Sequence, residues 1–182
     1  MLIAPQLKAS VMRLVVRFEK MRLSVVLVLF LLGLGSAQGQ TLPRFESYPA
    51  SGHFNGTPAP AIISHPRARL FRTMIQNQAK AQPNFAGHYH LATWGCGSDC
   101  QGLALIDART GRVYFNPRAL NVAGVPYQDE ERLQFRPDSR LLIISGSVDG
   151  FNRYQDEAKF YYVWRNNRFR LIRKARIQKY ES

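Results

Sequence analysis

The fold of this chain is limited most by a succession of short apolar segments, each separated from the next by a tight turn signal. Segments 87–94 and 101–107 flank one such turn, and the last two segments are joined by Asn166 and Asn167, which tolerate the positive φ of a two-residue hairpin. Consecutive hairpins of this kind build antiparallel sheets. The sequence therefore predicts a mainly antiparallel β (α+β) fold, a meander of about six or seven strands, and leaves a sandwich, a barrel and an open sheet as alternatives.

One segment has the periodicity of a helix instead. It begins with Ser64 as a candidate N-cap and Pro66 in the first turn, and Pro83 follows it as a stop signal. Its apolar residues at helical spacing are Leu70, Phe71, Met74 and Ile75. We expect one amphipathic helix of about four turns, packed on the sheet.

The N-terminal region has the charged, apolar and small-residue order of a secretory signal peptide. The uncharged run from Leu23 to Leu34 is shorter than the roughly 20 apolar residues of a membrane span, so we expect no stable membrane span after signal cleavage. Met21 is the expected true start, and the mature protein is expected to be periplasmic or extracellular. The expected organisation is residues 1–39 as an N-terminal extension plus signal peptide, residues 40–63 as an irregular lead-in, and residues 64–182 as a single β-rich domain with an N-terminal helix.

The chain is strongly basic, with a formal net charge of +13, and the excess is concentrated at its C-terminal end. Such a field attracts anions, and for an exported protein an anionic envelope polymer or a protein partner is favoured over nucleic acid. The candidate binding residues in this region are Arg168, Arg170, Arg173 and Lys174. The alternative is that these charges only keep an edge strand from pairing with other chains.

The two cysteines of the chain, Cys96 and Cys100, lie in the turn sequence CGSDC. In an oxidising compartment two cysteines at this spacing favour a disulfide, which would reinforce the turn. The alternative is a zinc site formed by His88, His90, Cys96 and Cys100, because two imidazoles and two thiolates suit tetrahedral zinc. Thiolates outside the cytosol are readily oxidised, so the disulfide is preferred and no metal or other cofactor is expected.

The braced turn is also a candidate contact surface. Its candidate binding residues are His88, His90, Trp94 and Asp99. A rigid loop loses less entropy on binding than a flexible one, which favours a role in recognition. Asp107 has a different interpretation, since the sequence DARTG places it in a turn, where its carboxylate can accept from the backbone and Gly111 can supply the left-handed residue.

Catalytic motifs are absent from the sequence: it has no zinc-protease helix motif, no serine nucleophile elbow, no phosphate loop and no dinucleotide fingerprint. An exported, non-catalytic envelope or periplasmic binding or interaction module is therefore the preferred function. One alternative is a small secreted hydrolase that uses His88 or His90 with a carboxylate such as Asp99. The other is a structural or inhibitory protein.

The segment from Asn84 to Tyr114 resembles the signature of an uncharacterised family of small exported bacterial proteins. The pattern is Phe-Ala-Gly, an aromatic strand, Trp-Gly-Cys-Gly, a second Cys followed by Gln, and then Ile-Asp and Thr-Gly before a strand. The matching residues are Phe85, Ala86, Gly87, Trp94, Gly95, Cys96, Gly97, Cys100, Gln101, Ile106, Asp107, Thr110 and Gly111. The resemblance implies export and a shared fold, and it implies no mechanism.

Overall fold

The computed structural model describes residues 41–97, 99–117, 121–124, 131–148 and 157–177. The predicted signal peptide and the proposed start at Met21 lie outside the described residues. Within the described part of the chain, no helix is long and apolar enough to cross a membrane.

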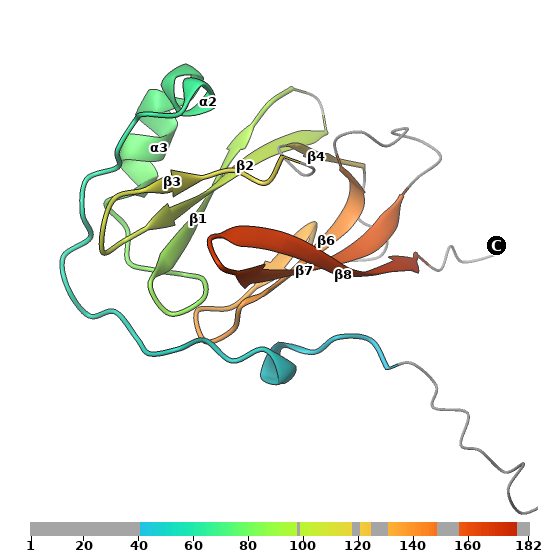
Figure 1. The fold of residues 1–182 in the computed structure, drawn as a ribbon. Helices are drawn as coiled ribbons and strands as arrows, with labels where there is room; N and C mark the ends of the chain where they lie inside the picture. The colour runs from blue at the N-terminus through green and yellow to red at the C-terminus, as the bar shows by residue number, and fades with distance from the viewer. Residues whose placement is uncertain (1–40, 98, 118–120, 125–130, 149–156, 178–182) are drawn as a thin grey trace, which may run out of the picture. The chain divides into compact units, whose positions relative to one another are not determined.

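The described residues form eight β-strands in one mostly antiparallel sheet, which confirms the predicted fold class (Figure 1). The sheet is open, so the closed barrel among the predicted alternatives is not formed. The strand order is β1-β2-β4-β6-β7-β8, with β3 paired to β2 and β5 paired to β6. The strands are β1 (Tyr89–Gly95), β2 (Cys100–Asp107), β3 (Val113–Tyr114), β4 (Asn121–Ala123), β5 (Leu133–Phe135), β6 (Leu141–Val148), β7 (Ala158–Arg165) and β8 (Arg168–Arg176).

The two halves of this sheet face each other across the main core. Strands β2, β4 and β6 separate β1 from β7 in the strand order, yet the ring centroids of Tyr89 on β1 and Trp164 on β7 are 5.3 Å apart. The sheet therefore bends back on itself, as in a sandwich whose two layers are continuous through the short strand β4. The fully buried side chains of this core include Phe85, Leu103, Leu105, Val122, Leu142, Ile144 and Phe160.

Two short helices cover the other face of β1 and β2, where one four-turn helix was expected. Helix α2 spans Pro66–Leu70 and helix α3 spans Arg72–Gln78. The chain leaves helical geometry at Phe71, whose φ is −114° and ψ is 26°, and the Phe71 ring stacks on Trp94 with centroids 4.6 Å apart. Packing on the indole thus takes precedence over the helical pattern.

The apolar stripe and the cap of this region also differ from the expectation. Leu70 and Met74 are exposed, whereas Ala68, Ile75 and Ala79 are buried against the sheet. The N-cap is His65 instead of Ser64, because the Nδ1 atom of His65 accepts from the Arg67 amide at 3.1 Å.

The lead-in covers the outer face of the second half of the sheet. A short 3₁₀-helix, η1 (Phe45–Ser47), places Phe45 and Tyr48 against a cluster on β6 and β7. The buried Ser139 hydroxyl donates to the carbonyl oxygens of Phe45 and Tyr48, at 2.8 and 3.1 Å. From Leu42 onward, the described residues of the lead-in consequently belong to the same compact unit as the sheet.

The predicted turns at Asp107 and at Asn166 and Asn167 are confirmed. The Asp107 carboxylate accepts from the Arg109 amide at 2.9 Å and from the Thr110 hydroxyl at 3.0 Å, and Gly111 has a φ of 72°. Asn166 and Asn167 have φ values of 52° and 56°, as a two-residue turn between β7 and β8 requires. Asp107 is therefore a turn residue, as expected.

Candidate functional site

The tip of the β1–β2 hairpin is closed by a disulfide between Cys96 and Cys100, as the sequence predicts. The two Cα atoms are 5.1 Å apart, and the Cys96 amide also donates to the Cys100 carbonyl at 3.1 Å. This pair of bonds fixes the short loop between the strands. Asp99, inside the ring, has a φ of 54°, a left-handed value that an aspartate tolerates better than most residues.

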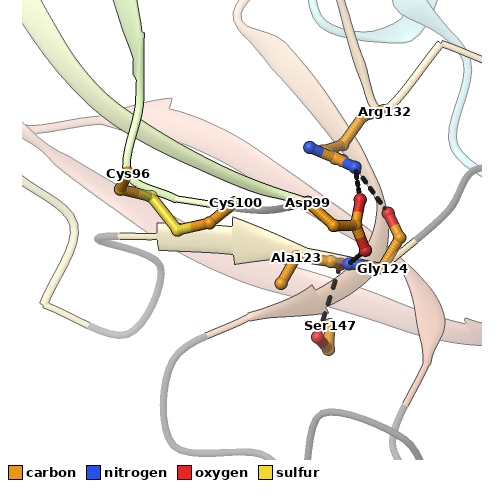
Figure 2. Close-up of polar contacts among 7 residues, drawn as sticks. All are labelled: Cys96, Asp99, Cys100, Ala123, Gly124, Arg132 and Ser147. Atoms are coloured by element: carbon orange, nitrogen blue, oxygen red, sulfur yellow. Dashed lines mark hydrogen bonds and ion pairs between the residues drawn. A yellow bond between two sulfur atoms is a disulfide. The ribbon is translucent and has the colours of Figure 1, made fainter.

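The Asp99 side chain binds other parts of the protein. One carboxylate oxygen accepts from the Gly124 amide at 3.0 Å, and the other pairs with the Arg132 guanidinium (Figure 2). Arg132 also donates to the Gly124 carbonyl at 2.7 Å. We refer to Asp99, Gly124 and Arg132 as the latch, because it ties the hairpin tip to the residues that follow β4 and precede β5.

The latch is partly screened from solvent. The Arg132 side chain is 18% exposed and the Asp99 side chain is 41% exposed, while Gly124 is buried. Directly beneath it, the Ser147 hydroxyl on β6 donates to the Ala123 carbonyl at 3.3 Å (Figure 2). The disulfide therefore braces a contact within the fold, and the carboxylate of Asp99 is engaged by that contact.

The two histidines lie near the opposite end of β1. His88 precedes the strand and His90 is its second residue, whereas the cysteines flank the far end of the hairpin. A seven-residue strand is roughly 20 Å long. The structure thus brings neither the four alternative zinc ligands nor the His88–Asp99 pair together, and no group of three metal-ligating side chains occurs among the described residues.

Each histidine has local contacts of its own. Burial lowers the pKa of His88 below the usual imidazole value, and the nearby Arg109 guanidinium lowers it further, while Asp107 acts in the opposite direction. The Nδ1 atom of His90 lies 3.0 Å from the Gln82 carbonyl oxygen. These contacts place His88 at the Asp107 turn and His90 beside the segment that follows α3.

Trp94 is buried, with 4% of its surface exposed, so it contributes packing at this position instead of a contact surface. Its indole lies between Phe71 and Gly102. A Cβ atom on Gly102 would be 2.3 Å from the Trp94 Nε1 atom, so the ring needs a glycine on the neighbouring strand. Trp94 and Gly102 therefore serve the contact between the helices and the sheet.

The basic residues of the C-terminal strand are divided between its two faces. Arg168, Arg170 and Arg173 pair with residues on the outer face of β7, where the lead-in packs. Lys174 pairs with Phe160 and lies over its ring, 5.4 Å from the centroid, on the face of the main core. The cause is a register shift that pairs Tyr161 with Arg173 and Tyr162 with Leu171, so that Ile172 is an extra residue.

Alternation in the sequence of the final hairpin predicts that Trp164 and Phe169 face the core and that Arg168 and Arg170 face solvent. Trp164 is 5% exposed, and Phe169 packs against the main core with its ring centroid 4.9 Å from that of Trp164. Arg168 and Arg170 are exposed. The predicted assignment of the two faces is confirmed for the part of β8 that precedes the bulge.

Several arginines are bound within the fold, whereas three exposed arginines of β8 are not. Arg132, Arg136 and Arg140 are bound internally, to Asp99, to Glu46 at 2.8 Å and to the Pro49 carbonyl at 3.0 Å. Within the described residues, Arg168, Arg170 and Arg176 make no hydrogen bond or ion pair.

The partners of Asp99 could not be predicted from the sequence, since neither Gly124 nor Arg132 stands in a motif with it.

No family model matches the chain, and neither a curated protein nor a solved structure is found to match it.

Proposed function

We propose that this protein is an exported, non-catalytic binding module of the cell envelope that engages an anionic partner, a polymer or a protein, through strand β8. The observation that carries the proposal is the charge of the last hairpin. From Ala158 to Arg176 the chain has seven Lys or Arg residues and no Asp or Glu. Three of the arginines on β8 are exposed and have no partner among the described residues.

The exposed cations of β8 lie close together and have no acidic residue near them in the sequence. Arg168, Arg170 and Arg176 fall within one nine-residue strand, and no Asp or Glu occurs from Ala158 to Arg176. Charges left without a partner repel one another, and an anionic ligand relieves that repulsion. We therefore expect an external anion to bind at the β8 arginines.

Two features support export. The uncharged run from Leu23 to Leu34, with small residues after it, has the pattern of a signal peptide. The bridge between Cys96 and Cys100 suits an oxidising compartment. Intact-mass analysis of the protein recovered from its producing cells tests this part, because a mature chain that keeps Leu23 to Leu34 would contradict it.

The binding experiment uses polyphosphate, an anionic polymer without peptide groups. The affinity of the mature wild-type protein is measured by isothermal titration calorimetry at low and at physiological salt. We expect binding that weakens steeply as the screening length shortens to about 8 Å. Replacement of Arg168, Arg170 and Arg176 by glutamine should abolish it.

A matched control makes the same change of charge elsewhere. Arg69, Arg72 and Lys80 are exposed on or beside the helices, and their replacement by glutamine should leave the affinity nearly unchanged. Arg173 and Lys174 are kept in both variants because they have internal contacts, so both should melt within a few degrees of the wild type. Equal affinity in the β8 variant and the control would contradict the proposal.

A further inference from the structure

The two terminal strands of the sheet differ in how their outer edges are covered. At β1, the Asn84 side chain accepts from the Leu91 amide at 2.7 Å and donates to the Leu91 carbonyl at 3.4 Å. The Gln78 side chain likewise accepts from the Thr93 amide at 3.0 Å and donates to the Thr93 carbonyl at 2.5 Å. Each amide side chain thus replaces one residue of a neighbouring strand, and the β1 edge is covered.

Strand β8 has no such cover within the described residues. It pairs with β7 on one side and is the last strand in the order. The Trp164 amide of β7 donates to the Arg140 carbonyl at 2.9 Å, away from β8. Trp164 and Phe169 are therefore a non-hydrogen-bonded pair, and the amide and carbonyl groups of Phe169 and of Leu171 face outward from the sheet.

The side chains along this edge select the kind of strand that fits. Leu171 and Ile172 are each 42% exposed, and the exposed Arg168, Arg170 and Arg176 flank them. A second copy of β8 would bring arginines against arginines, which opposes pairing between copies. An extended acidic segment with apolar residues at alternate positions would meet opposite charge and apolar contact together.

We propose that the outer edge of β8 binds an extended acidic segment of a protein partner, which joins the sheet as an additional strand. This rests on the proposed function and specifies the partner and the binding mode. Main-chain hydrogen bonds to Phe169 and Leu171 provide the alignment, and the arginines provide the preference for acidic sequences. The bulge at Ile172 limits the regular edge to the part of β8 that precedes it.

The test uses three synthetic ten-residue peptides of alternating Glu and Val. One is unmodified, and the other two carry N-methyl groups on alternate residues, one on the glutamates and one on the valines. All three have the same charge, but in each methylated peptide one set of amides can no longer donate. We expect the unmodified peptide to bind, and one methylated peptide to bind about tenfold or more weakly, because several main-chain hydrogen bonds are lost.

Amide hydrogen exchange locates the contact. In the complex with the unmodified peptide, the amides of Phe169 and Leu171 should exchange more slowly, while those of Leu91 and Thr93 at the covered edge should be unchanged. If both methylated peptides bind as tightly as the unmodified one, strand addition is overturned. If polyphosphate binds and the unmodified peptide does not, strand addition is also overturned, whereas the proposed binding of an anionic partner is kept. Failure of polyphosphate and of the peptide overturns both.

Discussion

Replacement of Asp99 by alanine tests whether the disulfide serves the latch. The substitution removes the acceptor of the buried Gly124 amide, and it removes the partner of Arg132. A buried donor left without a partner costs about 1–3 kcal/mol, and a partly exposed ion pair adds about 0–1 kcal/mol. The expected loss in the free energy of unfolding is about 2 kcal/mol. Asp99→Asn keeps an acceptor oxygen and should lose about 1 kcal/mol or less.

The role of the disulfide follows from a double-mutant cycle. Replacing both Cys96 and Cys100 by serine should cost about 2 kcal/mol, which is the loop-closure estimate for so small a ring. Without the ring, Asp99 is no longer held in its left-handed conformation at the tip. Asp99→Ala should therefore cost less in the serine background than in the wild type, by about 0.5 kcal/mol or more.

Urea denaturation of the four proteins, followed by tryptophan fluorescence, gives the free energies of unfolding. The m-values should agree, since the change is local. Additive losses in the double variant would refute the idea that the bridge positions Asp99. An unchanged stability of Asp99→Ala in the wild-type background would refute the latch itself.

Three further outcomes follow from the packing and the charges. Gly102→Ala should destabilise the fold by about 1–3 kcal/mol, because the new Cβ atom would lie 2.3 Å from the Trp94 Nε1 atom. Gly95→Ala, whose Cβ atom would have no heavy atom within 4 Å, should have little effect, and thermal melting of the two variants compares them. Phe169→Ala should cost about 3 kcal/mol and an exposed Arg170→Ala less than about 0.5 kcal/mol in urea denaturation, and equal losses would mean that the faces of β8 are misassigned. The pKa of His88 is lower in the folded protein than in the unfolded chain, so the unfolded chain takes up a proton on this imidazole more readily. The stability that neutral His88 contributes to the fold is therefore full above about pH 6.5, and it is lost as the pH falls through the pKa of His88 in the folded protein. His88→Gln should thus lessen the fall in melting temperature between pH 8 and pH 5.

The parts of the fold that the sequence predicts are those governed by local geometry. The turn at Asn166 needs residues that tolerate positive φ, and the turn at Asp107 needs a carboxylate and a glycine, so both are visible in a few letters. The same holds for the disulfide, whose partners are four residues apart. Alternation within β7 likewise predicts that Trp164 is buried.

The features that the sequence does not predict depend on contacts between distant segments. The helix break at Phe71 arises where its ring meets Trp94, which is on a strand. Arg132 is 33 residues from Asp99, and Gly124 is 25 residues from it. No spacing rule connects them, so the sequence predicts a role in recognition for Asp99, whereas its carboxylate is bound within the fold.

The bulge at Ile172 is also not predicted by the sequence, although it lies within one hairpin. Strict alternation would place Arg168, Arg170, Lys174 and Arg176 on one face of β8. The shifted pairing moves Lys174 and Arg176 to the face of the main core and moves Arg173 to the outer face. A bulge is a property of two paired strands, so one strand's sequence does not specify it.

The difference between the two sheet edges bears on where a partner can bind. The side-chain amides of Asn84 and Gln78 lie beside β1 and make four hydrogen bonds to its main chain. A new strand that approaches β1 must displace these four bonds. At β8 no described residue holds the corresponding positions, so an approaching strand exchanges solvent for main-chain bonds. Amide side chains suit this covering because each offers one donor and one acceptor, as a peptide group does. Arginine side chains have only donors, so they cannot accept hydrogen bonds from the β8 amides as Asn and Gln side chains can. Their positive charge nevertheless repels a second, like-charged copy of the strand. Within the described residues the edge of β8 is thus uncovered, and its charge opposes pairing with its own copies and suits the proposed acidic strand.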